Sequence, residues 1–73
     1  MDEVLEETAR CRLLAGDPMG ARRDYERLVA RFEKEPRRIR KLDPGLIDRV
    51  LEEHFAGPLL ERYRATCVAA GLV

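Results

Sequence analysis

The sequence predicts an all-α fold: one helical domain over residues 1–73, a small bundle of four helices arranged as two antiparallel helical hairpins. Three observations predict it. Apolar residues recur at spacings of three and four in four separate segments, which is the period of an amphipathic helix. Asp-Pro precedes two of these segments, and glycine or proline follows each of them. No segment shows the polar–apolar alternation of a half-buried strand.

The first helix is expected from about Asp2 to Ala15. Its first two turns carry only acidic charges, which favour the positive end of the helix dipole. Gly16 ends it, because glycine accepts the left-handed conformation after a helix. The periodic residues that predict its buried face are Val4, Thr8, Cys11 and Ala15, flanked by Leu5 and Leu14.

The second helix is expected from about Pro18 to Glu35. Asp17 is a strong N-cap, and proline in the first turn loses only an N–H that has no partner there. Pro36 ends this helix, because the residue before proline is pushed out of the helical region. The predicted buried stripe is Ala21, Tyr25, Leu28, Val29 and Phe32, and the opposite, charged side carries Arg23, Arg27, Arg31 and Lys34.

A basic connector, RRIRKL, leads to the second pair of helices. Asp43-Pro44 repeats the start signal of Asp17-Pro18 and predicts a third helix to about Phe55. Gly57-Pro58 separates it from a fourth helix, which runs to about Ala70. The expected buried residues are Leu46, Ile47, Val50, Leu51 and His54 on the third helix, and Leu59, Leu60, Tyr63, Thr66, Cys67 and Ala70 on the fourth.

The stretch GDPMGARRDYE has a Gly16-Asp17 turn, the small residue Ala21 and an aromatic residue, Tyr25, four positions later. This pattern resembles the turn and second helix of a tetratricopeptide repeat, over about residues 5–36. Leu5 stands where that family prefers tryptophan, and the second predicted hairpin does not repeat the spacing. The resemblance implies a helical hairpin with a tendency to bind proteins. It implies no particular ligand site.

Composition bounds the function. The 14 basic and 14 acidic residues cancel, so no net charge steers the whole chain to nucleic acid or to a membrane. The N-terminus is acidic and has no apolar run, so we expect no signal peptide or membrane span and a cytoplasmic location. The strong preference for arginine over lysine fits a GC-rich genome, and we expect a bacterial source.

The residues that could carry chemistry are few. We expect His54 to be a partly buried ring at the end of the third helix, and Cys11 and Cys67 to be small buried side chains. The alternatives are a disulfide, or a metal or Cys–His site that joins them. The usual ligand spacings are absent, as are phosphate-loop and hydrolase motifs. We therefore expect no enzyme, metal, cofactor or small-molecule substrate.

The densest charge cluster supplies the candidate partner-binding residues: Arg37, Arg38, Ile39, Arg40, Lys41 and Leu42. We interpret the chain as a non-catalytic protein–protein interaction module that docks a partner protein, or its own copy, through a hydrophobic groove between helices. The alternative is a small transcription-related regulator whose basic loop, residues 37–41, contacts nucleic acid. Acidic neighbours and the lack of an aromatic residue in the loop favour the protein partner. The expected exposed apolar residues are Ile39, Leu42, Leu46, Leu72 and Val73.

Overall fold

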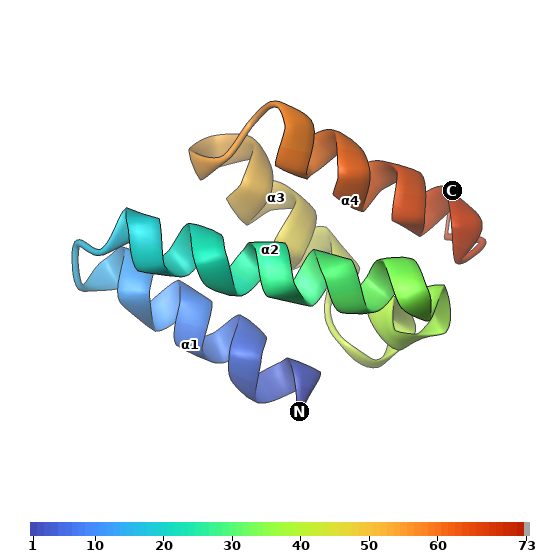
Figure 1. Ribbon diagram of the computed structural model, residues 1–73, viewed down its shortest axis with the longest axis horizontal. Helices are drawn as coiled ribbons and strands as arrows, with labels where there is room; N and C mark the ends of the chain where they lie inside the picture. Colours follow the sequence, from blue (N-terminus) through green and yellow to red (C-terminus); the bar gives the residue numbers. More distant parts are fainter. Residues whose placement is uncertain (73) are drawn as a thin grey trace.

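The computed structural model describes residues 1–72, and Val73 lies outside the described residues. Within residues 1–72 all regular structure is helical, which confirms the all-α prediction (Figure 1). The helices, in chain order, are α1 (Asp2–Leu14), α2 (Pro18–Lys34), the 3-10 helix η1 (Pro36–Lys41), α3 (Pro44–His54) and α4 (Pro58–Ala69). The four α-helices therefore end within one residue of the predicted limits.

The predicted capping signals act as expected. The Asp17 carboxylate accepts a hydrogen bond from the Gly20 N–H at 3.0 Å, which satisfies a free donor of the first turn of α2. Asp43 does the same for the Leu46 N–H at 3.2 Å, at the start of α3. Gly16 has a φ of 82°, the left-handed conformation predicted for the turn after α1.

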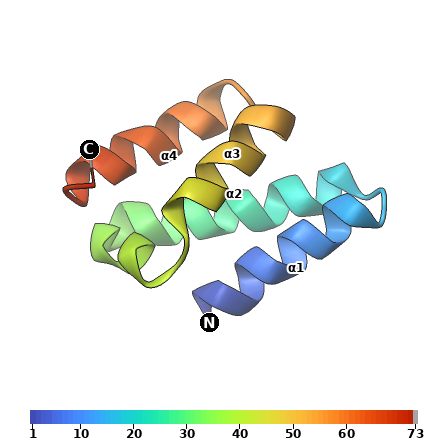
Figure 2. The same cartoon turned by 180° about the vertical axis from the view of Figure 1, so that it is seen from behind.

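The helices are arranged around α2. Helix α1 runs antiparallel beside it, and α4 lies along its other side (Figure 1). Helix α3 packs against α4 and crosses behind α2, so it is nearest to the viewer when the molecule is turned around (Figure 2). The first predicted hairpin is thus present as α1 and α2. Helices α3 and α4 follow one another in sequence and also pack against each other.

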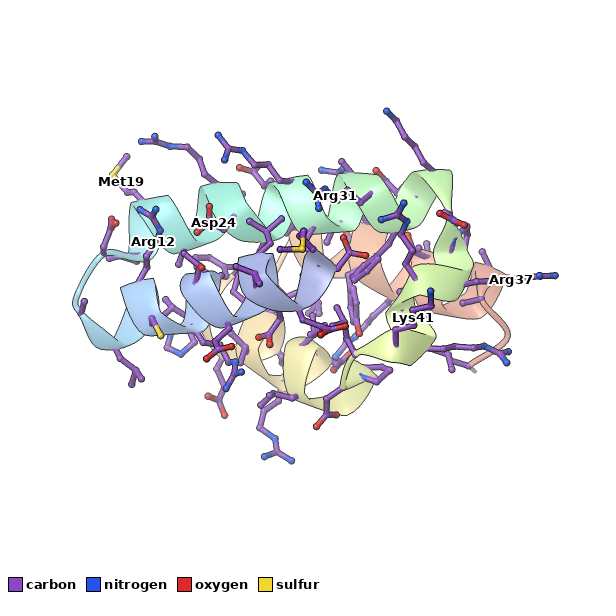
Figure 3. The ribbon with its side chains drawn as sticks, turned by 90° about the horizontal axis from the view of Figure 1, so that it is seen from below. Arg12, Met19, Asp24, Arg31, Arg37 and Lys41 are labelled. Atoms are coloured by element: carbon purple, nitrogen blue, oxygen red, sulfur yellow. The ribbon has the colours of Figure 1, made fainter. Side chains whose placement is uncertain are left out.

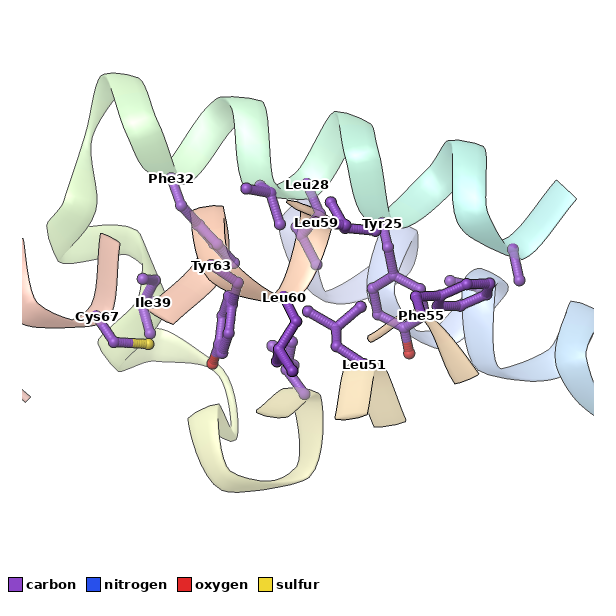
Figure 4. Close-up of a cluster of buried hydrophobic side chains, with 14 of the residues drawn as sticks. Tyr25, Leu28, Phe32, Ile39, Leu51, Phe55, Leu59, Leu60, Tyr63 and Cys67 are labelled. Carbon is purple, nitrogen blue, oxygen red and sulfur yellow. The ribbon is translucent and has the colours of Figure 1, made fainter. Parts of the chain in front are cut away.

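The core lies between α2, α3, α4 and η1 (Figure 4). All four aromatic side chains of the sequence are buried in it, and their rings form two tilted pairs. The centroids of Tyr25 and Phe55 are 6.0 Å apart, and those of Phe32 and Tyr63 are 6.4 Å apart. Such tilted contacts suit the charge distribution of aromatic rings. The buried stripes predicted for α2 and α4 are confirmed at every residue.

The buried face predicted for α1 is wrong. Val4, Cys11 and Ala15 are exposed, and Thr8 is only half-buried. The helix instead turns Glu6 and Ala9 inward, with Leu5 and Leu13 half-buried beside them. This orientation is held by polar contacts that apolar periodicity does not register.

Two polar contacts fix α1 against α2. Glu6 accepts hydrogen bonds from Arg10 at 2.8 Å and from the buried Tyr25 hydroxyl at 3.2 Å. Burial and the Glu6 carboxylate both raise the pKa of Tyr25, so the hydroxyl stays a donor. Arg12 Nε lies 2.9 Å from Oδ2 of the buried Asp24, across the hairpin in Figure 3. The contacts with Arg10 and Tyr25 make the buried acid Glu6 acceptable on the inner face of α1, and the contact with Arg12 does the same for Asp24 on α2.

Three further expectations are corrected. His54 is exposed rather than partly buried, because α3 ends there and the core is closed by the next residue, Phe55. The cysteines are both free: Cys67 is buried as expected, and Cys11 is exposed with its face of α1. Residues 36–41 form η1 rather than an irregular connector, because Ile39 turns into the core and fixes the segment.

Candidate protein-interaction surface

The predicted partner-binding cluster, residues 37–42, divides into structural and free side chains. Ile39 has no exposed surface, so it belongs to the core, and Leu42 is half-buried against it. Arg38 and Arg40 are both held by contacts within the chain. Only Arg37 and Lys41 are exposed and make no hydrogen bond or ion pair with residues 1–72 (Figure 3).

Arg38 ties η1 to both ends of the first hairpin. Its guanidinium donates to Glu35 at 2.7 Å and reaches Asp2, at the start of α1, at 3.4 Å. Arg31 of α2 donates to the same Asp2 carboxylate at 3.1 Å. Burial of Asp2 opposes its ionisation, but the hydrogen bonds from the two arginines outweigh that effect and lower its pKa.

Arg40 serves the end of α4. Its Nη2 and Nε donate to the Ala70 carbonyl at 2.7 and 3.2 Å, and this carbonyl belongs to the C-cap residue of the helix. A charged donor at this end satisfies a carbonyl that has no partner within the helix and favours the negative end of the helix dipole. Arg40 is therefore a structural residue.

The outer side of α2 carries the basic residues that the fold does not use. We define the basic face as Arg22, Arg23, Arg27 and Lys34. All four are exposed, and none makes an ion pair or side-chain hydrogen bond with residues 1–72. Arg23 and Arg27 are one helical turn apart, and Met19 precedes Arg23 by one more turn with 73% of its surface exposed. Arg37 adds a free charge beyond the far end of α2 (Figure 3).

The remaining arginines are mostly paired. One exposed ion pair links two helices that are distant in sequence: Arg62 of α4 binds Glu33 of α2 at 2.7 Å, and this contact lowers the pKa of Glu33. Outside α2 and η1, Arg49 of α3 is the one arginine with no such contact in residues 1–72. Free positive charge therefore concentrates on α2 and η1.

The α3 side of the molecule carries free negative charge. Asp48 and Glu52 share one partner, Arg64 of α4, at 3.0 and 2.6 Å. Two carboxylates on one guanidinium leave a net negative charge at this cluster. Glu53 adds an exposed carboxylate without an ion pair in the described chain.

A groove adjoins this acidic cluster, between the first turn of α3 and the second half of α4. We define the apolar groove by its lining residues Pro44, Gly45, Cys67, Val68 and Leu72, with Asp48 and Arg64 at its rim. Its volume is about 420 Å³. Val68 and Leu72 are 59% and 39% exposed, so apolar surface faces solvent here. The sequence contains no local signal for this groove, because its two walls come from segments that meet only in the fold.

The outcomes for the predicted exposed apolar residues are mixed. Leu72 is exposed as expected, Leu46 and Leu42 are half-buried, and Ile39 is buried, which makes that prediction wrong. Val73 lies outside the described residues. Two strongly exposed large apolar side chains, Leu14 at 90% and Met19 at 73% of their surface, flank the α1–α2 turn. The sequence did not predict the exposure of Leu14, because it placed this residue beside the expected buried face of α1.

The residues considered for chemistry are not brought together. His54 is exposed on α3 and makes no hydrogen bond to Cys67 among the described residues. Burial raises the pKa of the Cys67 thiol, which keeps it protonated at neutral pH. Residues 1–72 contain no group of three or more His, Cys, Asp or Glu side chains placed to hold a metal ion.

Comparison with protein-family models, curated proteins and solved structures finds no match for this chain. Among the described residues, no helix has the length and apolar character needed to cross a membrane.

Proposed function

We propose that this chain is a non-catalytic, cytoplasmic protein–protein interaction module that docks an acidic surface, of a partner protein or of its own copy, on the basic face of α2. One observation carries the proposal. The fold pairs or caps with most of its arginines, yet within residues 1–72 it leaves the four side chains of the basic face without a partner, all on one helix.

The spacing of these charges argues for an external partner. Arg23 and Arg27 lie one turn apart on the same side of α2, where like charges repel and slightly weaken the helix. Carboxylates of a docked protein would relieve this repulsion. Arg37 continues the free positive charge onto η1, so part of the predicted cluster joins the same surface. The resemblance of the α1–α2 hairpin to a tetratricopeptide repeat also supports protein binding.

The same charges give the alternative, nucleic-acid contact, a specific basis. The aromatic side chains weigh against it: all four are buried, so none can stack on an unpaired base. Glu26 also interrupts the basic face with a negative charge. A protein surface with scattered carboxylates fits this mixed pattern better than a continuous phosphate backbone.

Charge reversal on α2 tests the proposal. Tagged wild-type protein, Arg23→Glu, Arg27→Glu and the double variant are mixed with nuclease-treated lysate, and the retained proteins are identified. Arg49→Glu is the matched control, because Arg49 is an exposed arginine without an ion pair in the described chain, on another helix. We expect acidic proteins to be retained by wild type and Arg49→Glu and lost from the double variant.

Two results would contradict the proposal. One is a set of retained proteins that is the same for the double variant and the control. The other is a mobility shift of duplex DNA or RNA that weakens steeply with salt and disappears in the double variant, which would establish the nucleic-acid alternative instead.

A further inference from the structure

We infer that a second copy of this chain is an acidic partner of the basic face, and that copies associate head to tail. Met19 of one copy enters the apolar groove of the next, and Arg23 and Arg27 lie opposite the acidic cluster of its α3. This inference rests on the proposed function, since it names a partner for the same face.

Charge complementarity is the first argument. Helix α2, which carries the basic face, lies in front of α3 in Figure 1. The acidic α3 is nearest in the opposite view, Figure 2. Helix α2 with its unpaired arginines and helix α3 with its carboxylates thus lie on opposite broad faces, which are separated by the shortest extent of the molecule, 18 Å. On and beside α3, the carboxylates Asp48, Glu52 and Glu53 outnumber the cations Arg49 and Arg64. Opposite faces of two copies attract when they stack in the same orientation.

The apolar groove supplies the second argument. It is open, about 420 Å³ in volume, and lies directly beside Asp48 of the acidic cluster. Met19 is an exposed side chain directly beside the positive charges of the other face. An unbranched methionine side chain fills irregular apolar openings well. The apolar contact would therefore be made where the charges also meet.

The spacing of the side chains on the two helices also matches. On α2, Met19, Arg23 and Arg27 follow at intervals of four residues. On α3, Pro44 at the groove, Asp48 and Glu52 follow at the same interval. An interval of four is about 6 Å along a helix, so the two series match when α2 of one copy runs parallel to α3 of the next. Both arginines then meet carboxylates when the methionine meets the groove.

The positions of the two surfaces fix the kind of assembly. A two-fold symmetric dimer needs one self-complementary surface, whereas here the two halves of the contact lie on opposite faces. The contact is therefore heterologous, and each copy keeps one free face for the next. One helix against one groove buries a small area, which places the contact among weak, transient interfaces.

Sedimentation velocity of the purified protein tests this inference. A concentration series up to about 1 mM, at low and high salt, detects a contact of this class. We expect the mean sedimentation coefficient to rise with concentration without a plateau at the dimer, and to fall at high salt. The Arg23→Glu/Arg27→Glu variant, and separately Val68→Glu in the groove, should each weaken association about tenfold or more. Arg49→Glu should leave it unchanged or stronger.

Mixing the two variants gives the sharpest outcome. The double arginine variant keeps an intact groove and acidic cluster, and Val68→Glu keeps an intact basic face. We expect each alone to stay monomeric and the mixture to stop at a one-to-one dimer. Leu72→Glu serves as a second groove variant if Val68→Glu loses its helical circular dichroism.

The failures are distinguishable. Wild-type protein that stays monomeric up to about 1 mM overturns self-association, while lysate capture that depends on Arg23 and Arg27 would still support the proposed function. A dimer that Val68→Glu and the double arginine variant leave intact also overturns it. If the double arginine variant still captures the same proteins and still self-associates, both proposals are contradicted.

Discussion

Two buried tyrosines should make this protein unfold in alkali. Tyr25 and Tyr63 have no exposed surface, and burial raises the pKa of both hydroxyls well above the ordinary value near 10. The Tyr63 hydroxyl donates to the Pro44 carbonyl at 2.8 Å, and that of Tyr25 donates to Glu6. Each native hydroxyl therefore keeps its proton at a pH where the unfolded chain has lost it.

The magnitude follows from proton linkage. A group whose pKa is raised by folding contributes its full stability below its unfolded pKa and loses it as the pH rises above that value. Each tyrosine should thus lower the free energy of unfolding by about 1.4 kcal/mol per pH unit above about pH 10, and the two together by about 2.7 kcal/mol per unit. A domain of this size has only about 4 kcal/mol of net stability, which would be gone about one and a half units above pH 10. The raised pKa of Cys67 adds a loss of the same sign above pH 9.

Urea denaturation is followed by circular dichroism at a series of pH values between about 8 and 12. It measures how steeply the free energy of unfolding falls with pH. Tyr25→Phe should halve the tyrosine contribution to about 1.4 kcal/mol per unit. It should also lower the stability at neutral pH by about 1–2 kcal/mol, through the lost hydrogen bond to Glu6. This loss of stability at neutral pH does not change how steeply the free energy of unfolding falls with pH. The reasoning is refuted if tyrosinate absorbance rises with a midpoint near 10 while the helical signal persists, or if the slope is the same in Tyr25→Phe.

Three further predictions concern two helix caps and the thiols. Arg40→Ala should lower the free energy of unfolding by about 1 kcal/mol, because the carbonyl after α4 loses its donor, whereas Arg37→Ala should leave it unchanged; thermal melts compare the two. Asp17→Ala should cost about 1 kcal/mol through the lost N-cap of α2, and equal melting temperatures for variant and wild type would contradict this. Cys11 should react readily with a thiol reagent in the native state, and Cys67, which is 7% exposed at the groove, much more slowly until the protein unfolds, as mass spectrometry of the labelled protein would show.

The helix limits could be predicted because their signals are local. Asp17 and Asp43 cap helices through N–H groups three residues ahead, and Gly16 ends one through its own φ. Such interactions are complete within a few residues, so they can be read from the order of the amino acids. The buried stripe of α2 was equally clear, because every apolar residue on that side has a core partner.

The face of α1 could not be predicted for the opposite reason. The sequence offers two candidate stripes on this helix, one apolar and one that contains the acid Glu6. The structure buries the second, because Tyr25, nineteen residues away, donates to the Glu6 carboxylate. A stripe of Val4, Cys11 and Ala15 has the better apolar period, but no helix lies opposite it within the described chain. Apolar periodicity fails where a buried hydrogen bond to an acidic side chain decides the orientation.

The basic cluster illustrates the same limit at the candidate site. Four cations stand within five residues, yet Arg38 binds Asp2 and Arg40 binds the Ala70 carbonyl, 36 and 30 residues away in sequence. Their neighbours Arg37 and Lys41 make no such contact with residues 1–72. A three-dimensional partner, rather than residue type or spacing, separates the structural arginines from the free ones.

This division decides which substitutions report on binding. Arg40→Glu would place a carboxylate against the Ala70 carbonyl, so a loss of partner binding in this variant would follow from a destabilised α4 as readily as from a lost contact. Arg23 and Arg27 hold nothing within the described chain, so reversing their charge changes the surface and leaves the fold its contacts. A variant series that pairs these residues with Arg49, of the same type and exposure, therefore separates a change in the surface potential of α2 from a change in stability. Only the first should depend on salt, because solvent ions screen exposed charges while the buried core is indifferent to them.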